Sequence, residues 1–385
     1  MSNRQPVSLG QILSVQNGFA FDSKRFGDDG IPLIRIRDLK HGSDTQTRYL
    51  GDYDPQYLVD TGDLLIGMDG EFRCYEWKGG RALLNQRVCR LQDFAPEVEP
   101  KYIKYAIDFY LQAIEETTTY TTVKHLSSKQ IKEIEIPLPP LDEQKRIVAK
   151  LDEAHSFVMQ REKNHQAEVT ARKALFMQVL RDIFLHRATN EEWTIHAFGD
   201  FSSHQLGKML DKSKNSGELR PYLRNANIQW FRIDTSDILS MKIEDSERDR
   251  FRVRFGDLLI CEGGYPGRCA LWQDDSEMYF QKALHRARFD SIEAAKWAQY
   301  FLYFMTESGR LKEHFSGTGI MHLTGERLAR LSIPIPETAE LVSAVRTLDD
   351  FRLHLDALSE IQDAKGENLR NFNQRFAGDL LVGAL

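Results

Sequence analysis

Three charged residues in one short segment have the types and spacing of a metal-dependent nuclease site. Asp69 is followed by Glu76 and Lys78, so an acidic residue precedes a Glu-x-Lys pair. In such sites two carboxylates hold a divalent metal, and the lysine stabilises the charged intermediate. The segment makes metal-dependent DNA cleavage a candidate activity, although Glu-x-Lys pairs are also common by chance.

Other sequence patterns for catalysis are missing from the chain. It contains no GxxxxGK[ST], GxGxxG, HExxH or GxSxG motif and no Asn-Pro-Pro-Tyr segment. The four cysteines form no CxxC pair, so we expect buried free thiols and no metal site. His125 and His322 each precede a leucine, and we expect packing or helix-entry roles, with phosphate contact as the alternative. We therefore expect a protein that is not an enzyme.

Basic residues and asparagines gather in the irregular segments of both halves of the chain. Arginine and asparagine match the edges of guanine and adenine in the major groove, and lysine and arginine neutralise phosphates. The candidate DNA contacts are Arg35, Arg37, Lys40, Arg73, Lys78, Arg81, Arg87, Arg220, Arg224, Asn225, Asn227, Arg268, Lys282, His285 and Arg286.

These candidates occur in two copies of one sequence pattern. Gly62-Asp63-Leu64-Leu65-Ile66 recurs 194 residues later, and the motifs that follow recur in the same order with a shift that drifts to 197. The later pairs are Arg73-Cys74 with Arg268-Cys269, Trp77 with Trp272, Gln86 with Gln281, His125-Leu126 with His322-Leu323, and Leu151-Asp152 with Leu348-Asp349. Glu76 and Lys78 map to Leu271 and Gln273, so the second copy lacks the nuclease-like residues. A period this long describes a duplicated domain with its connector.

Each copy is predicted to mix strands and helices. Residues 31–37 and 64–66 read as strands, residues 101–116 as an amphipathic helix, and residues 127–132 as a short helix. A strand then ends in Ile136-Pro137-Leu138-Pro139. We expect globular domains over residues 1–140 and 189–337.

Two long helices are predicted over residues 141–188 and 338–385. Each has apolar residues at spacings of three and four, and each would be about 65 Å long. We expect the two helices to pair as an antiparallel coiled coil, so that the chain is an α+β protein with internal pseudo-two-fold symmetry. The predicted packing residues are Ile147, Leu151, Val158 and Phe176 in the first helix and Val345, Leu348, Leu355 and Phe376 in the second.

The composition restricts the class of protein further. The 385 residues are 41% hydrophobic and 28% charged, which is typical of a globular protein. A formal net charge of −6 argues against binding nucleic acid through bulk charge alone. We see no apolar stretch long enough to cross a membrane and no secretory leader, so we expect a cytoplasmic protein.

The motifs resemble those of the specificity subunits of Type I restriction–modification systems. The resemblance rests on Asn17-Gly18-Phe19-Ala20-Phe21, on Gly62-Asp63-Leu64-Leu65-Ile66, and above all on His125-Leu126 followed by Ile136-Pro137-Leu138-Pro139-Pro140-Leu141-Asp142-Glu143-Gln144. It covers essentially the whole chain, although Pro336-Glu337-Thr338-Ala339-Glu340 departs from the pattern in the second copy.

The resemblance implies a DNA-binding subunit that carries no catalytic residues. Each domain would read one half of a split site in double-stranded DNA, and the long helices would set the spacer and bind two modification subunits. S-adenosylmethionine, ATP and Mg²⁺ would act on the modification and restriction subunits, and this chain would bind no cofactor. A metal-dependent nuclease and a structural adaptor that does not read DNA are the alternatives.

Overall fold

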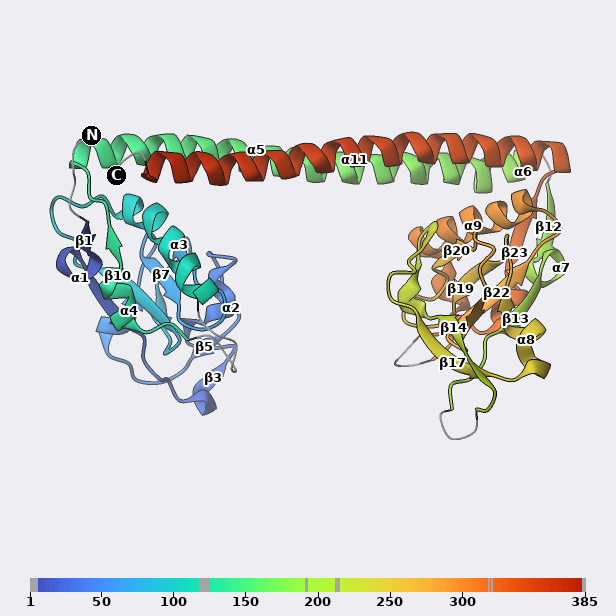
Figure 1. The fold of residues 1–385 in the computed structure, drawn as a ribbon, viewed down its shortest axis with the longest axis horizontal. Helices are drawn as coiled ribbons and strands as arrows, with labels where there is room; N and C mark the ends of the chain where they lie inside the picture. Colours follow the sequence, from blue (N-terminus) through green and yellow to red (C-terminus); the bar gives the residue numbers. More distant parts are fainter. Residues whose placement is uncertain are drawn as a thin grey trace. The chain divides into compact units, whose positions relative to one another are not determined.

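The structure is a computed structural model that describes residues 6–117, 125–190, 193–211, 215–317, 319 and 321–382, with backbone alone at residues 190, 367, 369–377 and 379–382. The chain divides into two compact units. Unit 1 comprises Met1–Asn164 with Ala364–Leu385, and unit 2 comprises His165–Asp363. Both units combine sheets and helices (Figure 1), which confirms the predicted α+β class.

Unit 1 is built on two sheets and a covering helix. One sheet has the strand order β2-β10-β7-β8 and is antiparallel throughout, and the other has the order β3-β5-β4-β9-β6 with β4 and β9 parallel. Helix α3, Pro100–Thr117, confirms the prediction over residues 101–116 and packs its apolar side against β8. The strands are β2 Ser14–Asn17, β3 Phe26–Gly27, β4 Ile31–Ile34, β5 Arg48–Tyr49, β6 Leu58–Val59, β7 Leu64–Gly67, β8 Cys74–Glu76, β9 Ala82–Leu84 and β10 Val88–Gln92.

The strand predicted over residues 31–37 is too long. Strand β4 ends at Ile34, and a short helix, α2, follows at Ile36–Leu39. The buried Asp38 carboxylate accepts the backbone N–H of Arg35 at 2.9 Å, which turns the chain out of the sheet. Arg35 and Arg37 therefore lie on a turn and a helix, not along the face of a strand.

Unit 2 repeats this plan with one strand fewer in its second sheet. Its sheets have the orders β13-β22-β19-β20 and β17-β14-β21-β18, again with one parallel pair, β14 with β21. Helix α9, Ile292–Glu307, takes the place of α3 and packs against β20. The strands are β13 Ser203–Leu206, β14 Glu218–Leu223, β17 Leu239–Ile243, β18 Arg252–Val253, β19 Leu258–Cys261, β20 Cys269–Leu271, β21 Met278–Phe280 and β22 Leu284–Arg288.

Matching backbone contacts confirm the duplication and correct one pair. The N–H of Val88 donates to Asn85 O, and the N–H of Leu284 donates to Gln281 O in the same turn of unit 2. Asn85 is thus the counterpart of Gln281, and the sequence pairing of Gln86 with Gln281 is wrong by one residue. The shift at this turn is 196, because each change of shift corresponds to a residue gained in a loop of unit 2.

The repeat also extends upstream of residue 62. Gly18 and Gly207 occupy the same place, where a Cβ would lie 2.2 Å from Asn85 O and 2.1 Å from Gln281 O. Only glycine allows the chain to pass this close to the neighbouring carbonyl. The Asn-Gly-Phe motif of unit 1 thus marks a backbone crossing that both units share.

The long helices are α5, Leu141–Arg181, which continues through a π-helical turn at Asp182–Arg187 and α6 at Ala188–Asn190, and α11, Thr338–Val382. Gln144 anchors the start of α5 and is fully buried. Its amide donates to Pro139 O at 2.7 Å and to Glu97 O at 2.9 Å, and its oxygen accepts from the N–H of Glu99. The Leu-Asp-Glu-Gln motif therefore fixes the helix to the loop ahead of α3.

The packing of the long helices differs in part from the prediction. Ile147 and Leu151 are buried in the core of unit 1, and Val345 and Leu348 in the core of unit 2. These apolar residues thus pack on their own globular unit. The prediction missed this because apolar spacing along a helix does not show which surface buries the apolar residues. Val158 is also buried, and the side chain of Phe376 lies outside the described residues.

Within unit 2, α5 and α11 run antiparallel. Phe176 stacks on Phe351 with ring centroids 6.1 Å apart, and both rings join the core together with the partly buried Leu355. His165 contacts Asp363 at 3.1 Å, while Arg187 contacts Glu340 at 2.9 Å. In the described part of the chain no helix is long and apolar enough to cross a membrane.

The same polar contact fixes each long helix to its unit. The Tyr105 hydroxyl donates to Asp152 at 2.5 Å, and the Tyr300 hydroxyl donates to Asp349 at 2.6 Å. Burial and the neighbouring carboxylate raise the pKa of both hydroxyls above the usual value. The recurrence of Leu-Asp at the 197-residue shift therefore reflects one repeated helix anchor.

Candidate nucleic-acid interface

One end of the four-stranded sheet gathers the loops of each unit. In unit 1 the antiparallel order places the carboxyl ends of β2 and β7 beside the amino ends of β8 and β10. A bridge from Asp69 to His125 and an ion pair from Lys40 to Glu71 bring two further segments to this end. We call residues 17–21, 35–42, 68–73, 85–87 and 125 the loop edge of unit 1, and residues 207–211, 224–230, 262–268, 281–283 and 322 the loop edge of unit 2.

Carboxylates hold the cations of the loop edge in unit 1. Asp69 contacts His125 Nδ1 at 2.7 Å and Arg87 Nε at 3.4 Å, and Glu71 contacts Lys40 Nζ at 2.5 Å. The lysine beside it lowers the pKa of the Glu71 carboxyl, so this group stays charged. The side chains of Lys40, Arg87 and His125 are each about half exposed or more, so the contacts are open to exchange with another anion.

The loop edge of unit 2 is held mainly by amide and backbone contacts. Asn225 Nδ2 donates to Gly263 O at 2.7 Å, and Arg268 donates to Asn225 O at 3.0 Å. Gly263 replaces Asp69, so the carboxylate that binds His125 in unit 1 has no counterpart beside His322. Arg224 pairs with the exposed Asp237 at 2.5 Å, and the side chain of Lys282 is exposed without a partner among the described residues.

The remaining exposed or partly buried candidates lie on several surfaces. Arg37 donates to Thr47, and Arg73 pairs with Glu115 of α3 at 3.6 Å. Arg220 pairs with Glu277 at 2.9 Å, and Lys78 is exposed beside the turn after α2.

Three candidates from unit 2 are buried, and their polar atoms bond to their own unit, which does not favour direct base or phosphate contacts. Asn227 accepts from the N–H of Arg224 and donates to two carbonyls of its own loop. His285 is fully buried and contacts Leu323 O, and burial lowers its pKa to about 4. Arg286 donates to the carbonyls of Arg250 and Arg252, and burial lowers its pKa to about 10.

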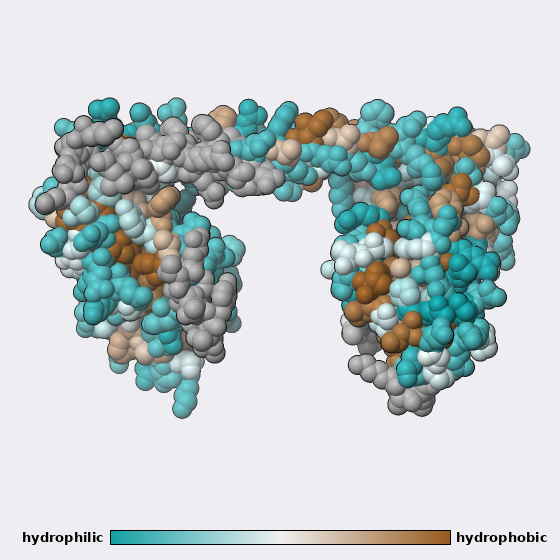
Figure 2. Space-filling view, in the orientation of Figure 1, coloured by the Kyte–Doolittle hydropathy of each residue, from teal (hydrophilic) through white to brown (hydrophobic). Residues whose placement is uncertain are grey.

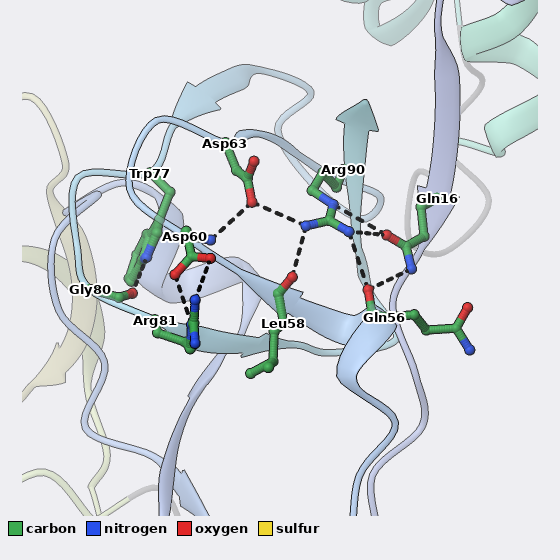
Figure 3. A network of polar contacts seen from close by, with 9 residues as sticks. All are labelled: Gln16, Gln56, Leu58, Asp60, Asp63, Trp77, Gly80, Arg81 and Arg90. Carbon is green, nitrogen blue, oxygen red and sulfur yellow. Dashed lines mark hydrogen bonds and ion pairs between the residues drawn. The ribbon is translucent and has the colours of Figure 1, made fainter. Parts of the chain in front are cut away.

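A partly buried arginine network in unit 1 corresponds to the contacts of Arg286. Arg90, its counterpart, donates to Gln16 Oε1, to the carbonyls of Gln56 and Leu58, and to Asp63 at 3.1 Å (Figure 3). These contacts tie β10 to the segment around β6. Arg90 is not among the candidates predicted from the sequence, although the repeat links it to Arg286 at the shift of 196 residues.

Arg81 belongs to the edge of the same network (Figure 3). It forms a two-point contact with Asp60, with N–O distances of 2.9 and 3.2 Å, and both side chains are exposed. The Arg81 guanidinium beside it lowers the pKa of the Asp60 carboxyl. An exposed pair of this kind contributes little to stability, so Arg81 stays available to an incoming anion.

The nuclease-like residues do not come together. Glu76 is opposite Leu64 at the start of β7, whereas Asp69 lies beyond the end of that strand. At about 3.3 Å per residue, the backbone positions of Glu76 and Asp69 lie about 16 Å apart along the strand direction, which does not favour a shared ion. Glu76 instead faces Lys104 at 3.8 Å. Among the described residues no group of three or more His, Cys, Asp or Glu is arranged to hold a metal.

Two copies of one fold, each with an exposed edge of loops, place the chain in a class of internally duplicated proteins. The chain belongs to the Type I restriction modification DNA specificity family, whose model matches residues 1–171 and 190–364. It is similar to the EcoBI specificity subunit of a Type I restriction enzyme from Escherichia coli, with 27% identity over 409 residues that cover 98% of this chain and 85% of that protein. The resemblance seen in the sequence is confirmed.

Two solved structures share the fold. One, from work on complex assembly and conformational transition of the type I R-M system, has a TM-score of 0.75 at 19% identity and covers 100% of this chain and 99% of that chain. The HsdS subunit of Thermoanaerobacter tengcongensis has a TM-score of 0.51 at 19% identity, covering 100% and 98%.

Proposed function

We propose that the chain is the DNA-reading subunit of a Type I restriction–modification complex, in which each unit reads one half of a bipartite site. The observation that carries the proposal is the duplicated loop edge: both units present cations and amides at the same end of the same sheet. Membership of the specificity family supports it. A few base pairs read by each unit, at about 1–3 kcal/mol for each mismatch, would add up to a selective site.

The ion pairs of the loop edges, each with at least one partner that is half exposed or more, suit exchange with DNA. Arg87, Lys40 and Arg224 are each held by a carboxylate on their own unit. A phosphate or a guanine edge that replaces the carboxylate gives back a charge-assisted hydrogen bond, so the exchange favours DNA that fits. On the face drawn in Figure 2, hydrophilic residues cover most of the visible surface of each unit.

We further propose that this chain takes no part in the chemistry. Two modification subunits would bind along α5 and α11 and use S-adenosylmethionine, and restriction subunits would use ATP and Mg²⁺ in the cytoplasm. The separation of Asp69 from Glu76 along β7 and β8 supports assigning cleavage to a partner. The two long helices would set the spacer between the half-sites.

Mapping of adenine methylation tests the proposal directly. Genomes of cells that carry the modification subunit with and without this chain are compared by single-molecule sequencing. We expect a split motif that is methylated only when the chain is present. The complex purified with its modification subunits should then bind a duplex of that motif selectively. If no new methylated motif appears and the complex binds no duplex selectively, the chain is a structural adaptor. If the chain alone cleaves DNA with Mg²⁺ and Glu76→Ala abolishes the cleavage, the chain is a nuclease.

A further inference from the structure

The loop between β19 and β20 in unit 2 presents an aromatic ring to solvent. The loop has the sequence Glu262-Gly263-Gly264-Tyr265-Pro266-Gly267-Arg268, and Tyr265 is 66% exposed at its tip. Single exposed rings are common on protein surfaces, so what matters is how the loop holds this ring. The loop belongs to the loop edge defined above.

Backbone contacts hold the loop in one conformation. The N–H of Tyr265 donates to Gly263 O at 2.9 Å, the N–H of Arg268 donates to Tyr265 O at 3.1 Å, and the N–H of Gly267 donates to Cys261 O at 3.0 Å. Gly264 and Gly267 have φ values of +74° and +92°, a region that favours glycine. Asn225 adds a side-chain bond to Gly263 O. The ring is therefore carried on a preorganised support.

One face of the ring is covered by a cation. The Arg268 guanidinium carbon lies 4.3 Å from the centre of the Tyr265 ring, and the same guanidinium donates to Asn225 O at 3.0 Å. This arrangement orients the ring and places a positive charge behind it. The high exposure of Tyr265 leaves ring surface available to a flat partner.

The corresponding loop of unit 1 buries its aromatic ring and exposes a charged side chain. It is one residue shorter between the paired strands, its aromatic residue Phe72 is fully buried, and its exposed Glu71 is held by Lys40. The fold at this position thus needs no exposed ring. Packing accounts for Phe72 but not for Tyr265.

We propose that Tyr265 is a base-stacking residue, which places its ring against one nucleobase of the half-site that unit 2 reads. The inference rests on the proposed DNA-reading function. The exposed Lys282 of the same loop edge provides a cation for the adjacent phosphate. Aromatic groups of this kind stack on bases or enter between base steps, and they do so with little dependence on hydrogen bonding.

The test uses the complex with its modification subunits and duplexes of the mapped motif that carry 2-aminopurine at each position of the half-site in turn. We expect Tyr265→Ala to weaken binding by about 5- to 150-fold, and Tyr265→Phe to stay within about twofold of the original protein. One 2-aminopurine position should change its emission with the original protein and not with Tyr265→Ala. Phe255→Ala is the matched control, because Phe255 is 59% exposed but precedes β19 at the opposite end of the sheet.

Three results would overturn the inference while leaving the proposed function intact. They are unchanged selective binding by Tyr265→Ala, an equal loss with Tyr265→Phe, and loss of the modification subunits from the Tyr265→Ala complex in sedimentation. Failure of the original complex to bind any motif selectively would instead reject the proposed function itself.

Discussion

Replacement of Asp69 by asparagine tests whether this carboxylate restrains the cations at the loop edge of unit 1. Asp69 lies 3.4 Å from Arg87 Nε and 2.7 Å from His125 Nδ1, and Arg87 is about half exposed. The amide keeps the shape of the side chain and removes its charge. Because arginine remains protonated at every pH used for DNA binding, the variant frees at least one permanent positive charge.

The size of the effect follows from counterion release. Each newly neutralised phosphate makes the plot of log Kobs against log salt concentration steeper by about 0.9. One contact from Arg87 therefore predicts a slope more negative by about 0.9. Between 50 and 200 mM salt this amounts to about a 3.5-fold larger loss of affinity than in the original protein. Binding at the lower concentration should be tighter, and discrimination against unrelated DNA should be smaller.

Fluorescence anisotropy of a labelled duplex, titrated with the assembled complex at four salt concentrations, measures the slope. Glu133→Gln is the control, since Glu133 pairs with Lys129 on the exposed surface of α4, Ser128–Glu133, and its loss changes the net charge equally. An unchanged slope for Asp69→Asn, or an equal change for Glu133→Gln, would refute the reasoning. Weaker binding confined to the cognate motif would mean that Asp69 itself reads a base.

Three stability predictions follow from the described contacts. Burial raises the pKa of Asp108 to about 6 from 3.8, so the folded state binds the proton more tightly than the unfolded state. The free energy of unfolding should therefore fall by about 2 kcal/mol from pH 4 to pH 6. Asp108→Asn should remove this fall in urea titrations at several pH values. Gly18→Ala should destabilise unit 1 by about 1–3 kcal/mol or more, because its Cβ would meet Asn85 O, whereas Gly27→Ala, with open space around it, should be neutral or slightly stabilising in the same assay. Gln144→Ala should cost about 1–3 kcal/mol, because it leaves buried carbonyls and an N–H unpaired, and limited proteolysis should detect cleavage near the start of α5.

The repeat was predictable from the sequence because its recurring residues make contacts that each copy needs. The contacts of Tyr105 with Asp152 and of Tyr300 with Asp349 are examples. A hydroxyl–carboxylate contact requires these residue types, so both copies contain them and the sequences match at these positions. Glycine at positions 18 and 207 is a second case, but its shift of 189 lies outside the range followed by the matched motifs. Different loop lengths in the two units changed the shift there, and no sequence pattern predicts those lengths.

Burial of charged residues was the main feature that could not be predicted. Strand β22 reads Leu284-His285-Arg286-Ala287-Arg288, which looks like an exposed basic strand. The strand is central in its sheet, and its arginine reaches two carbonyls of a neighbouring segment that lies more than thirty residues away in sequence. No local pattern encodes those acceptors. The apolar residues of α5 could not be assigned to a packing partner for the same reason, because tertiary packing determines which surface buries them.

The net charge of −6 is consistent with a chain that binds DNA by exchange of ion pairs. Lys40, Arg87 and Arg224 each hold a carboxylate of their own unit, so random phosphates gain little by displacing it. A matched half-site offers base edges as well as phosphates, and these added contacts favour replacement of the carboxylate by DNA. The carboxylates therefore lower non-specific affinity more than specific affinity. On this argument, acidic residues at the loop edges increase the selectivity of a DNA-reading subunit, and their removal should raise affinity and reduce discrimination together.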